Sequence, residues 1–369
     1  MTASARHSML LDPHSRRKLN RGALYLFLSL GGVITCFPFV WMILTSFKTY
    51  AEAIATPPTV FPAEWGVRLG VLGAAFASHP LWLVALVAWL ALGIWVMRRF
   101  HETRWRILYL LAHLALFLVV ALLDFWGQRG LAAAWDSTVA QRGVALKPFW
   151  DNYVEAWRRA PFAYYFRNSI IMSVATPMLI VATSAPAAYA FARMRFPGAN
   201  LLFMLFLATM MVPSEVVLIP NFITISQLGW KNSFAALVVP YAVSVLSIFF
   251  LRQFFKSVPD DLFDAATIDG CGHTRFLLAI ALPLAQPALV STGMFNFLSA
   301  WNSLLWPLLV TDDETMRPLA LGLASFSTEA GTQFNLYMAA ASFTIVPVIV
   351  LFLFVQEQFI EGIARTGIK

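Results

Sequence analysis

The chain has 369 residues, of which 59% are hydrophobic and only 12% are charged, and its mean hydropathy is +0.71. These values exclude an ordinary soluble domain and indicate a polytopic membrane protein. The formal net charge of +7 does not indicate nucleic-acid binding, because the basic residues gather in short loops and no nucleic-acid motif accompanies them.

Eight apolar segments are long enough to cross a membrane as helices, which takes about 20 residues each. They lie at about residues 23–47, 80–98, 107–126, 168–192, 200–222, 233–255, 276–300 and 334–356. The first follows a basic N-terminus but is too long for the apolar part of a cleaved signal peptide, so it is expected to stay as a span. The sequence therefore predicts an all-α membrane protein with about eight transmembrane helices.

The distribution of Lys and Arg predicts the orientation of these spans, because cytoplasmic loops retain basic residues. With the N-terminus inside, 16 of the 26 basic residues fall in the inner segments. Both termini are therefore expected in the cytoplasm. The outer loops, at about 48–79, 127–167 and 301–333, contain aromatic residues such as Trp157, Tyr164 and Tyr165, which we interpret as interfacial anchors.

Chemistry-bearing motifs are missing from the sequence. It contains no Gly-x-x-x-x-Gly-Lys-Ser/Thr phosphate loop and no catalytic or metal-binding histidine pattern. Two cysteines, Cys36 and Cys271, are too few for a disulfide framework. A proton-driven secondary carrier would want a carboxylate near the midplane, whereas Asp124 and Glu215 both lie near the predicted outer interface. The chain is therefore expected not to be an enzyme, and any transport energy should come from another protein.

One cytoplasmic stretch, SVPDDLFDAATIDGCGHTRF from Ser257, carries its own helix signals. Ser257 with Asp260 three residues later suggests a capping box, Pro259 suits a first turn, and Gly270 suits a stop. The pattern predicts a short helix of about ten residues, with an apolar side made of Leu262, Phe263, Ala266 and Ile268. Such a helix can enter a groove on a cytosolic partner or lie on the bilayer as an amphipathic loop helix.

The following residues predict a second helix that enters the next span. Thr274 is placed to cap this helix, and Pro283 predicts an early bend. Cys271 and His273 are interpreted as loop residues without chemistry.

This stretch resembles the Glu-Ala-Ala loop of the membrane subunits of ATP-binding-cassette importers. The family pattern is Glu-Ala-Ala, three residues, Gly, nine residues, then Ile-x-Leu-Pro, and here only the first Glu is replaced by Asp. The matching residues are Asp264, Ala265, Ala266, Gly270, Ile280, Leu282 and Pro283, and Asp269 also fits the usual form. The resemblance implies that this loop contacts cytosolic ATPase subunits.

The resemblance covers about residues 20–65 and 148–369 and is strongest to maltose-type inner permeases, the carbohydrate branch of the binding-protein-dependent family. Supporting segments include MVPSEVVLIPNF around Glu215, FLSAWNSLLWPLL from Phe297 and the C-terminal ending. Relatives of this type have six spans. The expected organisation is a cytoplasmic segment 1–22, a first helix and outer loop 23–65, an inserted two-helix hairpin 66–147 and a permease core 148–369 with its coupling loop at 257–275.

The resemblance also implies the function and the partners. The chain would form half of a translocation pathway for a sugar or oligosaccharide, and it would work with a second permease, a pair of cytosolic ATPases and an extracytoplasmic binding protein in a lipid membrane. No cofactor is expected in this chain, since ATP and Mg²⁺ would be bound by the partner ATPase. The alternatives are the same importer class carrying glycerol-phosphate or another organic solute, and an ion-coupled secondary transporter.

Two further sets of residues follow from these expectations. Sugars are held by aromatic stacking and a few amide, hydroxyl or carboxyl groups. The candidates along the core spans are Glu215, Tyr241, Ser244, Asn296, Trp301 and Asn302. The C-terminal tail from Gln356 through Gly362 to Lys369 is expected to reach the ATPase pair.

Overall fold

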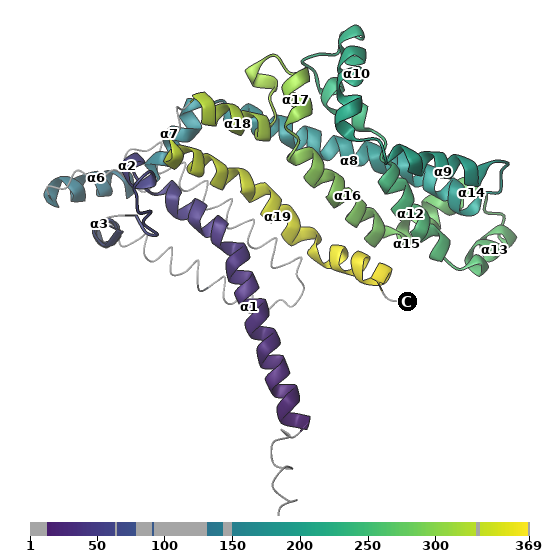
Figure 1. Ribbon diagram of the computed structural model, residues 1–369, viewed down its shortest axis with the longest axis horizontal. Helices are drawn as coiled ribbons and strands as arrows, with labels where there is room; N and C mark the ends of the chain where they lie inside the picture. Colours follow the sequence, from purple (N-terminus) through teal and green to yellow (C-terminus); the bar gives the residue numbers. More distant parts are fainter. Residues whose placement is uncertain are drawn as a thin grey trace, which may run out of the picture.

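The computed structural model describes residues 13–62, 65–78, 91, 131–142, 150–329 and 333–367. Helices and short helical turns make up the regular structure of this part, which contains no strand (Figure 1). The predicted spans 80–98 and 107–126 lie outside the described residues apart from Ala91, and so does most of the predicted hairpin 66–147.

The helices and helical turns are named in the order in which they occur along the chain. Their bounds are α1 (Pro13–Ser46), α2 (Tyr50–Ala53), α3 (Trp65–Ser78), α6 (Leu131–Arg142), α7 (Asp151–Arg159), α8 (Phe162–Arg193), α9 (Ala199–Thr209), α10 (Ser214–Gln227), α11 (Phe234–Val238), 3₁₀ turn η1 (Val239–Tyr241), α12 (Val245–Ser257), α13 (Asp260–Ile268), α14 (His273–Phe276), π-helical turn η2 (Leu277–Ala281), α15 (Leu282–Leu284), α16 (Gln286–Trp301), α17 (Leu305–Val310), 3₁₀ turn η3 (Glu314–Met316), α18 (Leu319–Glu329) and α19 (Phe334–Gly367).

Within the described residues, three continuous helical stretches are long and apolar enough to cross a membrane. They are Phe27–Ser46 of α1, Phe162–Arg193 of α8 and Phe334–Phe354 of α19. They correspond to the first, fourth and eighth predicted spans. Helix α1 begins at Pro13, ten residues before the predicted start of its span at residue 23, and α19 continues beyond the predicted span to Gly367.

The three other described spans are each bent between two helical parts. This corrects the prediction of continuous segments at 200–222 and 233–255, and it confirms the early bend that Pro283 predicts for 276–300. The axis turns by 94° between α9 and α10, by 46° between the α11–η1 stretch and α12, and by 79° between α15 and α16. Pro213 directly precedes α10, and Pro287 lies in the first turn of α16. Proline cannot donate the backbone hydrogen bond that would continue a preceding helix, so each site favours a new start.

Helix α8 is the central element of the fold. It packs against α12 and α16 along its length. Its face toward α12 includes the buried small residues Ser184, Ala185 and Ala188, which let helix backbones approach closely where lipid supplies no hydrophobic drive. Figure 1 shows α13 at one end of the long axis and α2, α3 and α6 at the other.

The predicted outer loops are folded rather than extended. Helices α6 and α7 lie in the stretch 127–167, and α17, η3 and α18 lie in 301–333. Tyr165, interpreted as an interfacial anchor, is 1% exposed, and its hydroxyl donates to the Glu314 carboxylate at 2.7 Å. Asn168 donates to the carbonyls of Thr315 and Arg317, so α8 fixes the turn at η3.

Lys48, just past α1, is 2% exposed. Its Nζ donates to the Thr59 carbonyl at 2.5 Å and lies 4.4 Å from the centroid of the Trp41 ring. Burial lowers the pKa of the Lys48 amine, and the Glu52 carboxylate partly offsets this effect. The Asn152 amide donates to the Lys48 carbonyl at 2.8 Å, which ties this turn to α7.

Candidate functional site

The coupling segment, residues 257–283, contains the predicted short helix as α13, which covers Asp260–Ile268. Its N-terminal signals act differently from the prediction. Ser257 remains in the last turn of α12, where its hydroxyl donates to the Phe254 carbonyl at 2.7 Å, and Pro259 occupies the N-cap position without a side-chain cap. The predicted capping box is therefore wrong, because the serine hydroxyl is already used by the preceding helix.

The C-terminal end of α13 stops at a Schellman motif. Gly270 has a φ of +75°, its amide donates to the Thr267 carbonyl at 3.0 Å, and the Cys271 amide donates to the Ala266 carbonyl at 2.8 Å. Glycine suits this position because a left-handed backbone costs other residues about 1–2 kcal/mol. No atom lies within 4 Å of the place where a Cβ of Gly270 would stand, so the requirement concerns the backbone conformation and not the space.

The residues of α13 divide into an anchored and a free face. Ala266 is buried and Phe263 is partly buried in a cluster formed with α8 and α12. Leu262 and Ile268 are exposed, and Ile268 retains 87% of its accessible surface, so the predicted single apolar side is in fact split. The motif residues Asp264, Ala265, Asp269 and Gly270 are exposed as well. The exposed surface of α13 thus carries small and acidic side chains, with the apolar side chains of Leu262 and Ile268 at its edges.

Arg193, in the last turn of α8, binds the connection between α12 and α13. Its Nε donates to the Phe255 carbonyl at 3.0 Å, one terminal nitrogen donates to the Val258 carbonyl, and the other pairs with the Asp260 carboxylate. The Arg193 side chain is 10% exposed whereas that of Asp260 is 86% exposed. The guanidinium therefore binds backbone and carboxylate together at the connection between α12 and α13.

Tyr189, one turn before Arg193 on α8, contacts the segment that follows α13. Its hydroxyl lies 3.0 Å from Nδ1 of His273. The His273 ring also stacks on Phe263 at 5.2 Å between centroids, and Phe263 meets Phe276 edge to face at 5.1 Å. The interpretation of His273 as a loop residue is wrong, because it begins α14 and its ring connects α8 to α13. We refer to Tyr189 and Arg193 with His273 and Asp260 as the α8 latch.

Past the latch, the chain enters the next span through a short and irregular path. Gly272 is the N-cap of α14, and Thr274 lies inside that helix, so the predicted Thr274 cap is wrong. The motif residue Ile280 belongs to the π-helical turn η2, while Leu282 and Pro283 form α15 before the 79° bend. A π-helical turn marks a change of helix register and often occurs at functional sites.

Two of the pathway candidates meet at the break between η1 and α12. Ser244 caps α12 by accepting the Ser247 amide at 3.2 Å, and the Asn296 amide of α16 donates to the Ser247 hydroxyl at 3.0 Å. The Ser184 hydroxyl of α8 donates to the Ser244 carbonyl at 3.4 Å. These four residues, Ser184, Ser244, Ser247 and Asn296, form a neutral polar seam where α8, α12 and α16 meet.

The other pathway candidates do not join this seam. Glu215 is exposed at the start of α10, where the Ser214 hydroxyl donates to it at 3.0 Å. Tyr241 packs edge to face on Trp306 at 5.8 Å. Trp301 is 6% exposed and stacks on Phe297 within a core cluster, and the exposed Asn302 donates back to the Leu298 carbonyl at 2.9 Å.

The C-terminal residues continue the last span as helix. Gln356 lies in α19 and donates to the Leu353 carbonyl at 3.3 Å, and Gly362 lies in the same helix. Lys369 is outside the described residues.

Comparison with known proteins identifies the family. A model described as binding-protein-dependent transport system inner membrane component matches residues 180–364. The chain is 34% identical over 220 residues to the arabinooligosaccharides transport system permease protein AraQ of Halalkalibacterium halodurans, covering 59% of this chain and 79% of that protein. It is 36% identical over 239 residues to the sn-glycerol-3-phosphate transport system permease protein UgpE of Yersinia pestis bv. Antiqua, covering 62% and 85%.

The fold agrees with this identification. A solved bacterial ABC transporter involved in the import of the acidic polysaccharide alginate matches with a TM-score of 0.62 and 16% identity, covering 95% of this chain and 99% of that one. This chain therefore belongs to the binding-protein-dependent transport system inner membrane component family, and it is a multi-pass permease of a prokaryotic inner membrane.

Proposed function

We propose that the chain forms half of the translocation pathway of an ATP-binding-cassette importer and couples to a cytosolic ATPase through α13. The observation that carries this proposal is the placement of α13. The motif residues Asp264, Ala265, Asp269 and Gly270 are exposed, while Phe263, the buried motif residue Ala266 and the α8 latch hold the other side. A short helix fixed on one face and free on the other is suited to enter a groove on a partner.

The proposed mechanism transmits force and performs no bond chemistry in this chain. ATP and Mg²⁺ would be bound by the partner ATPase, and closure of that partner would displace α13. Because Arg193 and Tyr189 belong to α8, the displacement would reach the helix that packs against α12 and α16. Rotation of these helices would change which side of the membrane the pathway faces, with a second permease completing it and an extracytoplasmic binding protein delivering the solute.

A pair of glycine variants tests the coupling. Gly270→Val places a β-branched residue at φ +75°, whereas Gly272→Val keeps a φ of −79° that any residue adopts. Neither added Cβ would meet an atom within 4 Å. In proteoliposomes that contain the whole importer, we expect Gly270→Val to lower transport per ATP hydrolysed and Gly272→Val to leave it unchanged. Equal ratios for both variants would contradict the proposed role of α13.

The proposed solute is a sugar or oligosaccharide. The seam of Ser184, Ser244, Ser247 and Asn296 offers hydroxyl and amide groups and no charge, and it lies at a helix break, where solute sites of transporters are often built. A relative that matches over 79% of its length is named as an arabinooligosaccharide permease. We further propose residues 148–369 as the permease core, with Ser244 and Asn296 nearer the solute than Glu215, Tyr241, Trp301 or Asn302.

The alternative solute is glycerol-phosphate, which the 36% identity to a glycerol-3-phosphate permease favours. A phosphate would call for a cation, and the seam contains none. Uptake of labelled arabinooligosaccharide and of glycerol-3-phosphate by the reconstituted importer distinguishes the two. Uptake that follows an ion gradient without ATP would instead identify a secondary carrier and would overturn the importer proposal itself.

A further inference from the structure

A pocket of about 640 Å³ lies where α8 ends, α9 begins and α12 approaches its C-terminus, and its lining includes none of the α8 latch residues and none of the polar seam. Its lining contains three basic residues, Arg195, Arg252 and Lys256, and no carboxylate. The basic residues predict that this end of the spans faces the cytoplasm. The pocket is therefore a positively charged hollow at the inner boundary of the membrane.

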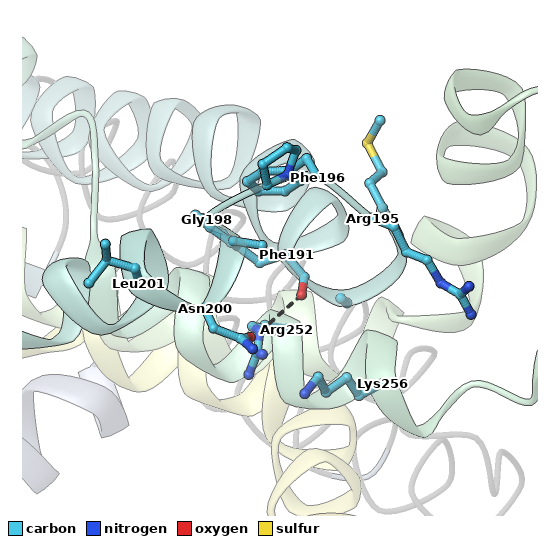
Figure 2. Close-up of a pocket in the computed structure, with 12 residues that line it drawn as sticks. Phe191, Arg195, Phe196, Gly198, Asn200, Leu201, Arg252 and Lys256 are labelled. Atoms are coloured by element: carbon cyan, nitrogen blue, oxygen red, sulfur yellow. Dashed lines mark hydrogen bonds between the residues drawn. The ribbon is translucent and has the colours of Figure 1, made fainter.

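Arg252 is the residue of this pocket whose surroundings most favour a bound ligand. It is 9% exposed, and its Nε donates to the Phe191 carbonyl at 3.2 Å (Figure 2). Its guanidinium lies 4.0 Å from the centroid of the Phe203 ring. Its two terminal nitrogens make no hydrogen bond or ion pair within the described part of the chain. A buried charge without an anionic partner is costly, so the free side of this guanidinium favours an anion.

Two neighbouring side chains complete the anion-binding side. Lys256 follows Arg252 by one helical turn on α12, which places both cations on one face. Asn200 lies in the first turn of α9, three residues before the Phe203 ring that carries Arg252, and Figure 2 shows Arg252, Asn200 and Lys256 together. The Arg195 side chain points away from these three in the same view. An arginine fork, an ammonium and an amide are groups that bind phosphate.

The surroundings of the cluster indicate where the phosphate comes from. Leu201 and Met194 also line the pocket, and they keep 57% and 42% of their surface exposed. Exposed apolar side chains beside a basic pocket at the membrane boundary suit a molecule with both a phosphate and acyl chains. Basic pockets between transmembrane helices on the cytoplasmic side bind anionic lipid headgroups in this way.

We propose that Arg252, Lys256 and Asn200 bind the phosphate of an anionic phospholipid of the inner leaflet. The site is separate from solute transport, and its occupancy is measured without transport. The experiment therefore gives the same answer whether or not the proposed importer function holds.

Native mass spectrometry of the full-length chain released from nanodiscs tests the site. In discs of phosphatidylglycerol and phosphatidylcholine, we expect selective retention of phosphatidylglycerol. Lys256→Gln should weaken this retention about fivefold, as each juxtamembrane cation contributes about 1 kcal/mol, and Asn200→Ala should weaken it less. Both residues are exposed, so neither change removes core packing. The matched control Arg195→Gln removes the same charge from the same pocket and should retain the lipid like the native chain.

Three results would overturn the proposal. The first is equal phosphatidylglycerol retention by the native chain and by Lys256→Gln. The second is a loss of retention in Arg195→Gln as large as that in Lys256→Gln, which would show an effect of net charge alone. The third is displacement of the lipid by inorganic phosphate added to the buffer, which would identify free phosphate as the ligand.

Discussion

The hydroxyl of Tyr189 lies 3.0 Å from Nδ1 of His273, although 84 residues separate them in the chain. This contact joins the C-terminal end of α8 to the residue that begins α14, directly after α13. Tyr189→Phe removes the hydroxyl and keeps the ring that packs on Phe255 and Phe276. Because one hydrogen bond contributes about 0.5–1.5 kcal/mol, we expect transport per ATP to fall several-fold while the protein remains folded.

Tyr153→Phe is the matched control for that experiment. The Tyr153 hydroxyl bonds the Ser46 hydroxyl at 2.6 Å, at the end of α1 and far from α13. It should leave transport per ATP unchanged. If the two tyrosine variants show the same ratio, the Tyr189–His273 contact has no role in coupling.

Arg193 and Asp260 should differ in importance although they form one ion pair. Arg193→Ala also removes the bonds to the carbonyls of Phe255 and Val258, whereas Asp260→Asn leaves those bonds in place. We expect Arg193→Ala to increase proteolytic cleavage between α12 and α13 strongly, since bonds to charged groups contribute about 1.5–3 kcal/mol each. The exposed Asp260 should contribute less than about 1 kcal/mol. Similar cleavage of both variants would show that the carboxylate dominates.

Gly322 of α18 packs directly on Tyr165. A Cβ at this position would stand 2.2 Å from Cδ2 of the Tyr165 ring, which is buried and hydrogen-bonded to Glu314. Gly322→Ala should therefore destabilise the fold by about 1–3 kcal/mol, the usual cost of overpacking. Gly293→Ala in α16 meets no atom within 4 Å and should be neutral or slightly stabilising. Thermal unfolding in detergent compares the two, and equal melting temperatures would contradict the close packing.

The lowered pKa of the Lys48 amine leads us to expect that the stability of the fold depends on pH. Burial lowers the pKa of its amine in the folded chain, while the unfolded chain keeps the ordinary value of 10.5. Between these two pKa values the unfolded chain binds more protons, so the free energy of unfolding rises with pH across that window. The melting temperature of the native chain relative to Lys48→Met should therefore rise as the pH approaches 10.5. Parallel curves for the two proteins would contradict this assignment.

The sequence predicted the positions of some helices and one helix end. Residues 168–192 fall within α8, and the helix before Gly270 ends where the glycine allows a left-handed backbone. These features depend on apolar length and on one residue's conformational freedom, both of which are properties of short stretches. The family resemblance, carried by the spacing from Asp264 to Pro283, is confirmed by the match over residues 180–364.

The latch could not be predicted in the same way. Nothing near His273 indicates that its partner is Tyr189, because contacts between separate helices depend on how the helices pack. Two of the three bends were missed for another reason: hydropathy measures apolar length and does not detect whether a helix is continuous. Pro213 was the available signal for the bend before α10, whereas Pro283 did predict the bend before α16.

Pro177 and Pro186 lie inside α8, and each removes one hydrogen bond from its backbone. The latch residues Tyr189 and Arg193 lie beyond Pro186. Tyr165 and Asn168, which bind the turn at η3, lie before Pro177. The helix thus has its weakest resistance to bending between its two ends. A displacement of the C-terminal end of α8 would therefore change the angle of its N-terminal end, and the stiffness of the short stretch between Pro177 and Pro186 would set how large that change is.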